Sequence, residues 1–112
     1  MSAPFNGIDH VDAAVARDRG HVSVGFDDRL VVGRAAAVRR FIADELDALP
    51  SDGRAIVDLS AVTELDAAGL AAVTSPVFAT RRRGCRVTVL PPTSGSARRF
   101  AQTVGILPIG VG

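Results

Sequence analysis

One amphipathic helix places the strongest constraint on how this chain can fold. In residues 33–49 the large apolar side chains recur every three or four positions and therefore share one helical face; they are Val38, Phe41, Ile42, Leu46 and Leu49. Most charged side chains of the segment fall on the other face. Burial of each large apolar side chain contributes roughly 1.5–3 kcal/mol, so this face must pack against another element. The pattern predicts a helix that covers a sheet.

Segments typical of strands lie on both sides of this helix. Residues 11–16 are expected to form a short edge strand, and residues 21–26 alternate apolar with small or polar side chains as a strand does. Residues 27–29 are predicted to form a polar turn. After the helix, residues 54–59 are apolar on both faces, which indicates an interior strand, and residues 60–65 are expected to be a connection.

A second helix is expected to begin immediately after Asp66. Asp is a strong N-capping residue because its carboxylate accepts the free N–H groups of the first helical turn. Pro76 removes one backbone donor, so this helix either kinks there or restarts with Ser75 as its cap. Three arginines followed by Gly84 form the stop signal.

The remaining segments continue the alternation of strands and helices. Residues 85–90 alternate as a strand does. A short helix follows, with one apolar face that carries Ala97, Phe100, Ala101 and Val104, and residues 106–109 form a final apolar segment that is either core or interface. This order of elements predicts an α/β fold in which helices pack on a mixed sheet.

The length and charge of the chain exclude several classes of protein. Its 112 residues suit one domain, expected over residues 11–112 after a flexible N-terminal lead-in at residues 1–10. A net charge of +1 provides no field that would attract nucleic acid or an anionic membrane. We find no signal peptide and no apolar run near the roughly 20 residues that span a bilayer. We therefore expect a cytoplasmic protein with no direct membrane insertion.

The residue types that usually carry catalysis are sparse. His10 and His21 lie in no ligand-like cluster, so we expect no metal site and no cofactor. Cys85 is the single cysteine; it is either a reactive thiol beside Arg86 or, more often at such a position, a plain strand residue. The arginines at 81–83 either bind phosphate or simply stabilise the negative end of a helix dipole. The sequence therefore predicts a protein that is not an enzyme.

One stretch resembles the signature region of STAS domains, the family that includes the bacterial anti-sigma factor antagonists. An apolar strand that ends in Asp58-Leu59-Ser60 is followed by a short loop to Asp66, the small residues Ala67 and Ala68, and then Gly69-Leu70. The last strand and helix, including residues 86–90 and 97–100, follow the family pattern in register. The resemblance covers roughly residues 20–110.

The resemblance implies a mixed sheet of four or five strands with helices mainly on one side. It also implies a partner-binding surface that is formed by the loop and helix that begin at Asp66; it comprises Asp66, Ala67, Ala68, Gly69, Leu70 and Thr74. The implied partner is an anti-sigma factor that is also a serine kinase with an ATP-binding fold. In family antagonists this kinase phosphorylates a serine at the second small position after the Asp.

Two departures from the family pattern bear on function. Ala68 stands at the phosphoacceptor position, and alanine has no hydroxyl, so this site cannot be phosphorylated. Thr63, Thr74 and Ser75 lie nearby, but none stands at the matching position. In addition, the run around Asp28 is out of register by a residue or two with the family's partner-contacting Asp. We nevertheless expect Asp28 to contact the partner.

Two classes of function fit these features. The first is a non-catalytic antagonist that binds an anti-sigma factor and is not switched by phosphorylation at position 68. The second is a STAS scaffold or accessory subunit of a larger signalling or transport complex, whose partners would be its other subunits. A homodimer is compatible with either function.

Overall fold

The structure is a computed structural model, and it describes residues 13–104 of the 112-residue chain. The lead-in at residues 1–10 and the apolar segment at 106–109 lie outside the described residues. The elements follow one another as β1 (Ala13–Asp18), β2 (His21–Leu30), α1 (Val32–Asp47), β3 (Arg54–Leu65), α2 (Ala67–Arg82), β4 (Arg86–Leu90) and α3 (Gly95–Val104). The predicted alternation of strands and helices is therefore confirmed.

The four strands form one mixed sheet in the order β1-β2-β3-β4. The outer pair β1–β2 is an antiparallel hairpin, whereas β2–β3 and β3–β4 are parallel. Arg19 and Gly20 connect the hairpin strands, both with positive φ angles of 34° and 78°. That backbone geometry suits the right-handed twist of the strands, and the glycine adopts it without steric cost.

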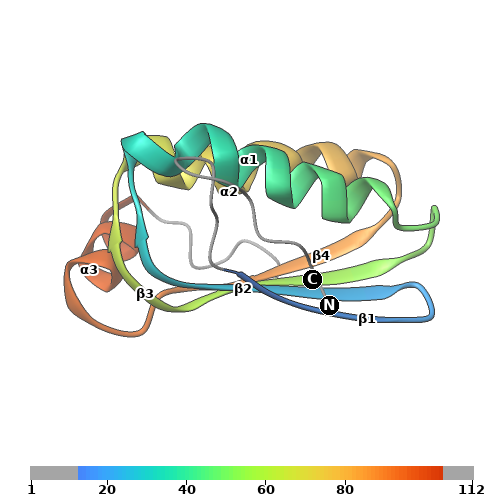
Figure 1. Cartoon of the computed structure of the whole chain (residues 1–112), viewed down its shortest axis with the longest axis horizontal. Helices are drawn as coiled ribbons and strands as arrows, with labels where there is room; N and C mark the ends of the chain where they lie inside the picture. Colours follow the sequence, from blue (N-terminus) through green and yellow to red (C-terminus); the bar gives the residue numbers. More distant parts are fainter. Residues whose placement is uncertain (1–12, 105–112) are drawn as a thin grey trace.

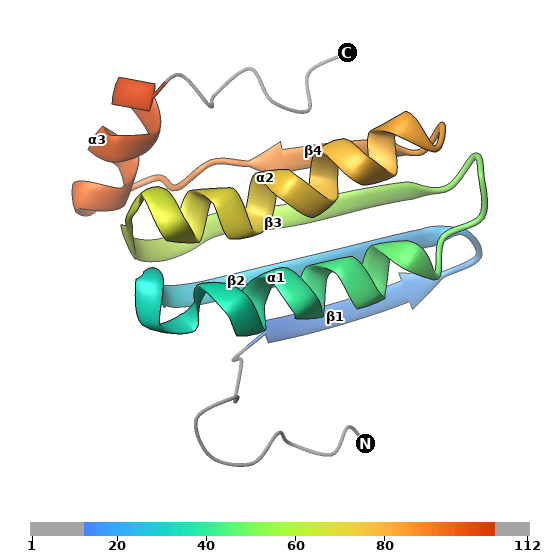
Figure 2. The ribbon, with the colours of Figure 1, turned by 90° about the horizontal axis from the view of Figure 1, so that it is seen from above.

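Helices α1 and α2 lie side by side over one face of the sheet, and α3 lies at one end (Figures 1 and 2). The helical face predicted at Val38, Ile42 and Leu46 is fully buried and joins a core with the helix-facing residues of the strands, among them Val24 and Val57. This arrangement of a mixed sheet with helices mainly on one side confirms the expected fold class.

Two predictions about the strands are wrong. Residues 27–29 are not a turn, because β2 continues to Leu30, and residues 60–65 are not a connection, because β3 continues to Leu65. The two strands pair as far as Leu30 opposite Leu65, with irregularities between Gly25 and Asp27 and again after Asp28. Such bulges add residues to one strand and break the alternation of period two, so the sequence pattern conceals the extension.

Helix α2 runs without interruption from Ala67 to Arg82 with Pro76 inside it. The predicted restart at Ser75 is therefore wrong, whereas the predicted beginning after Asp66 and the end at the arginine run are confirmed. None of the helices in residues 13–104 is long and apolar enough to cross a membrane.

Candidate functional site

The candidate site lies at the end of the sheet where β2 and β3 finish and both long helices begin. Leu30 is the last residue of β2, and α1 starts two residues later; Leu65 is the last residue of β3, and α2 starts two residues later. Because β2 and β3 are parallel and paired to their last residues, these two connections are neighbours in space. The N-termini of α1 and α2 therefore lie together at this end.

The carboxylate of Asp66 caps both helices. One oxygen, Oδ1, accepts the Gly69 N–H at 2.8 Å in the first turn of α2, which confirms the predicted N-cap. The other oxygen, Oδ2, accepts the Val32 N–H at 2.9 Å in the first turn of α1. Helix α1 has no capping side chain of its own, because its N-cap residue is Val31. One charged side chain thus satisfies a free donor in each helix and places a negative charge at two positive helix termini.

Gly69 sits inside this junction and not on its surface. Gly69 is buried, and a Cβ built on it would stand 1.9 Å from the backbone oxygen of Leu30. That same oxygen accepts the Asp66 N–H at 3.3 Å. The glycine therefore allows α2 to approach the end of β2, and this close approach is to the protein's own backbone.

The exposed side of the junction is built from small side chains. Ala67 is exposed, and Ala68 and Thr74 are half-buried on α2, where the larger Leu70 is also half-buried and packs against the core. Ala68 stands at the position where the resemblance implies a phosphoacceptor, and its side chain is a methyl group without a hydroxyl.

Asp28 lies at the same end of the sheet, on the exposed side of β2. Its φ angle is 66°, a left-handed conformation that Asp adopts more readily than most residues. Its backbone oxygen accepts a hydrogen bond from Thr63 Oγ1 at 3.1 Å, which ties the irregular part of β2 to β3. The exposed Asp28 side chain therefore extends from a backbone position that is tied to β3.

Val32 was not predicted as a site residue. Its side chain is 72% exposed, the most exposed large apolar side chain of residues 13–104, and its N–H is the donor to Asp66. The sequence does not indicate that Val32 contacts Asp66, because the contact joins two segments 34 residues apart. Only the parallel pairing of β2 with β3 brings them together.

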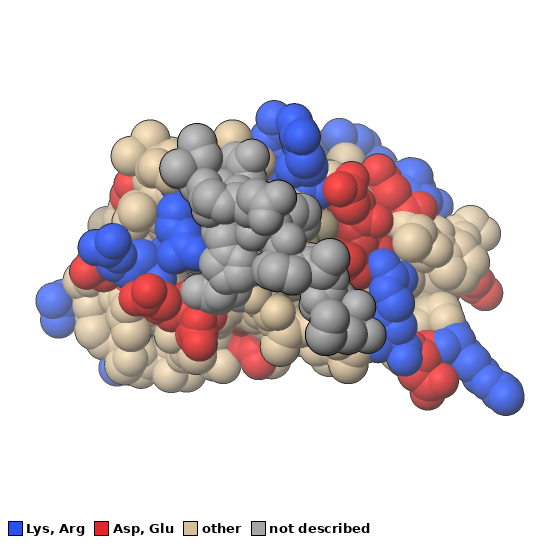
Figure 3. Space-filling view, viewed as in Figure 1, with Lys and Arg blue, Asp and Glu red and all other residues tan. Residues whose placement is uncertain are grey.

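Cys85, the candidate reactive thiol, is buried in the part of the chain that the structure describes. Cys85 is 5% exposed, and its Sγ lies 3.3 Å from the Pro50 carbonyl oxygen as a hydrogen-bond donor. Residues 13–104 contain no group of three or more His, Cys, Asp or Glu side chains that is arranged to hold a metal ion. Arg and acidic side chains are interspersed over the face shown in Figure 3.

Comparison with known proteins relates this architecture to a fold family. A scan against protein-family models finds no match, and a search of curated proteins finds none. Solved structures do match. The anti-sigma factor antagonist SpoIIAA in its unphosphorylated form is 13% identical with a TM-score of 0.62, over 85% of this chain and 83% of that chain. An anti-sigma factor antagonist from Mycobacterium paratuberculosis is 25% identical with a TM-score of 0.60, over 95% of this chain and 84% of that chain.

The chain has the STAS-type fold of anti-sigma factor antagonists. The protein Mglu also matches, with 24% identity and a TM-score of 0.58. That match spans 73% of this chain but only 20% of Mglu, so the chain corresponds to a small part of that longer protein.

Proposed function

We propose that the protein is a non-catalytic regulator of bacterial transcription that acts as an anti-sigma factor antagonist in the cytoplasm. The observation that carries the proposal is the match to two antagonists over more than four fifths of each chain. The function requires no cofactor and no metal, and its partner is an anti-sigma factor of the ATPase and serine-kinase type.

The proposed contact surface is the exposed side of the junction described above. Ala67 and Ala68 form its centre, with Thr74 further along α2 and Asp28 on β2. Small side chains at the start of a helix let a partner approach the helix backbone closely. Asp66, Gly69 and Leu70 support this surface: Asp66 fixes the two helix ends, Gly69 admits the close approach to Leu30, and Leu70 packs against the core.

Val32 extends the proposed surface onto α1. The Val32 N–H donates to the Asp66 carboxylate, so the exposed Val32 side chain lies near that carboxylate. A partner that covers Ala67 therefore meets an apolar side chain next to a carboxylate that is already hydrogen-bonded within the protein. The centres of protein interfaces favour apolar side chains over unpaired charges. We therefore include Val32 among the contact residues.

The absence of a hydroxyl at Ala68 determines how binding is controlled. A phosphate group would add a charge of roughly −1.5 to −2 near the Asp66 carboxylate and disrupt a fitted interface by repulsion. Because Ala68 cannot receive this group, the surface stays in its binding-competent form when a kinase-type partner is active. Control must then act on the partner, on the amount of the protein, or at another residue.

Affinity purification of the full chain from its native host, with mass spectrometry and gel filtration, tests this function. We expect one dominant partner with an ATPase-type anti-sigma fold, and we expect the Ala67–Ala68 surface to be needed for its capture. Recovery of the chain only in multi-subunit particles without an anti-sigma factor would contradict the proposal.

That second outcome would support a scaffold or accessory role. The match to Mglu agrees with such a role, because the region that matches this chain makes up about a fifth of a longer protein. In this role the surface around α2 would bind other subunits of a larger complex or a second copy of the chain. Gel filtration of the pure protein separates these two cases.

A further inference from the structure

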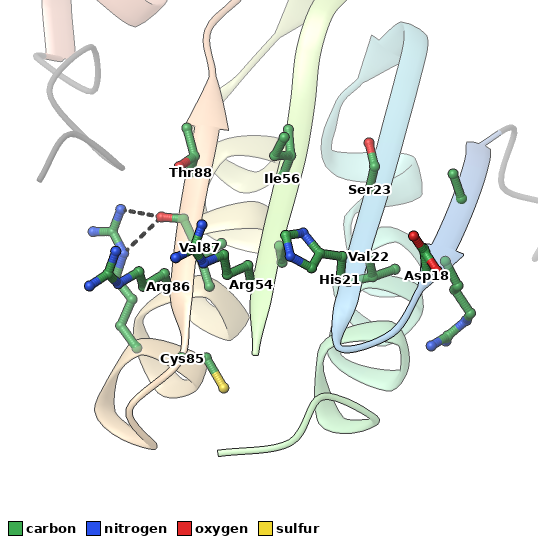
Figure 4. A pocket seen from close by; sticks show the side chains of 14 residues that line it. Asp18, His21, Val22, Ser23, Arg54, Ile56, Cys85, Arg86, Val87 and Thr88 are labelled. Atoms are coloured by element: carbon green, nitrogen blue, oxygen red, sulfur yellow. Dashed lines mark hydrogen bonds between the residues drawn. The ribbon is translucent and has the colours of Figure 1, made fainter. Parts of the chain in front are cut away.

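The face of the sheet that α1 and α2 leave uncovered carries a row of basic side chains at one end. His21, Arg54 and Arg86 begin β2, β3 and β4 and stand side by side, with His21 opposite Arg54 and Arg54 opposite Arg86. All three are exposed, whereas the next residue of each strand is buried toward the helices. Figure 4 shows the three side chains on the same side of the sheet.

The row has too few negative charges to balance it. Like charges directly opposite each other on neighbouring strands are destabilising. Within residues 13–104, neither Arg54 nor Arg86 forms an ion pair with an acidic side chain. Asp18 is the acidic residue of the row, and it stands next to His21 on β1, at the opposite end from Arg86. Two adjacent, permanently charged guanidinium groups thus have no acidic partner among residues 13–104 and can donate to an external anion.

These cations line one end of a hollow on the open sheet face. Its volume is about 870 Å³, in the range of roughly 300–1,000 Å³ that is typical of small-molecule sites. The next row along the strands consists of Ser23, Ile56 and Thr88, which stand opposite one another and form the floor. Ile56 is 41% exposed there, so the floor offers an apolar surface beside the cations.

Arg81 adds a cation held in place at the edge of this hollow. Its Nε and one terminal nitrogen donate to the Val87 carbonyl oxygen at 3.2 Å and 2.6 Å (Figure 4). These bonds fix the guanidinium beside β4 and leave its remaining N–H groups as donors. A preorganised donor loses little entropy when it binds a ligand.

We propose that this hollow binds a small, soluble organic phosphate monoester. The phosphate group carries a charge of roughly −1.5 to −2 at neutral pH, which matches the combined charge of the Arg54 and Arg86 guanidinium groups, whereas a carboxylate carries only one negative charge. Arginine forks also bind phosphate oxygens in pairs. The organic part of the ligand lies on Ile56, and the Ser23 hydroxyl is available for a hydrogen bond.

This site is independent of the proposed anti-sigma function. The row of His21, Arg54 and Arg86 is at the N-terminal ends of the parallel strands on the uncovered face, and the α1–α2 junction is at their C-terminal ends. A ligand in the hollow therefore leaves Ala67 and Ala68 free for a partner.

Titration of the ¹⁵N-labelled full chain with phenyl phosphate, at constant ionic strength, tests the site. We expect saturable shifts of the amide signals of His21, Arg54, Ile56 and Arg86. Arg54→Gln and Arg86→Gln should each weaken binding about tenfold or more, because each removes charge-assisted hydrogen bonds. Arg39→Gln, the same change on the exposed side of α1, should leave the affinity unchanged.

Two further measurements keep the result unambiguous. The melting temperatures of Arg54→Gln and Arg86→Gln should equal or exceed that of the unchanged protein, since each relieves repulsion between like charges. Benzoate, with a single charge on the same ring, should bind about tenfold more weakly than phenyl phosphate. The site is contradicted by the absence of saturable binding, by equal binding of benzoate, or by equal losses in Arg54→Gln and Arg39→Gln.

Discussion

The backbone of Gly69 lies so close to the carbonyl oxygen of Leu30 that a Cβ on the glycine would stand 1.9 Å from that oxygen. This contact joins the start of α2 to the end of β2. Because the Leu30 oxygen also accepts the Asp66 N–H, the position of the helix is set by backbone atoms at two adjacent points. The geometry of the proposed binding surface therefore depends on the absence of a side chain at position 69.

Gly69→Ala should destabilise the protein by about 3 kcal/mol, because the added methyl group forces α2 away from β2. Gly33→Ala is the matched control: it lies in the first turn of α1, and a Cβ added there would meet no other part of the protein within 4 Å. Gly33→Ala should stabilise the fold by about 0.4–1 kcal/mol, because alanine gives the unfolded chain less conformational entropy than glycine does. Urea denaturation of both variants measures the difference, and equal stabilities would refute the close approach.

Replacement of Asp66 should reveal that its carboxylate caps two helices. Each cap contributes about 0.5–2 kcal/mol, so Asp66→Ala should lower the free energy of unfolding by about 1–4 kcal/mol. Asp66→Asn retains one acceptor oxygen and should lose about half as much. If the carboxylate capped α2 alone, Asn, which is as good an N-cap as Asp, would restore nearly full stability.

Val32→Ser should weaken partner binding without a change in stability. The side chain is 72% exposed, so its replacement removes almost no buried apolar area from the folded protein. Within the proposed interface, the loss of this apolar contact is expected to reduce affinity about fivefold or more. Isothermal titration with the purified partner measures the effect, and an unchanged dissociation constant would remove Val32 from the surface.

Ala68→Ser should restore an acceptor for a kinase-type partner. The second residue of α2 is half-buried at the exposed side of the junction, and a serine hydroxyl fits there with little strain. Incubation with the partner and ATP should phosphorylate the serine variant and leave position 68 of the unchanged protein unmodified. Phosphopeptide mapping locates the phosphate group. Its absence from position 68 of the Ala68→Ser variant would argue against a serine-kinase partner.

Much of the fold follows from the sequence because the long helices and inner strands have regular periods. The apolar face at Val38, Ile42 and Leu46 required a sheet beneath it, and the Asp66 cap fixed where the second helix begins. The extensions of β2 and β3 were not predictable. The bulges near Asp27 and Asp28 place three exposed residues in a row, which is the pattern of a turn.

The site was only partly predictable for a related reason. Residues 66–70 are contiguous, so their motif is visible in the sequence. The contacts of Asp66 with Val32 and of Gly69 with Leu30 link distant segments, and only the paired ends of β2 and β3 bring them together. The same holds for the row of His21, Arg54 and Arg86, which is formed by strand register alone.

The affinity of Ala68→Asp for an ATPase-type anti-sigma factor tests the proposed function most directly. An aspartate at the second position of α2 suits the helix N-terminus and should leave the melting temperature intact, so its effect reports on the surface. We expect binding to weaken about tenfold or more through charge repulsion and desolvation, whereas Ala79→Asp, at an exposed position further along the same helix, should bind normally. Equal affinities of Ala68→Asp and the unchanged protein would contradict the account.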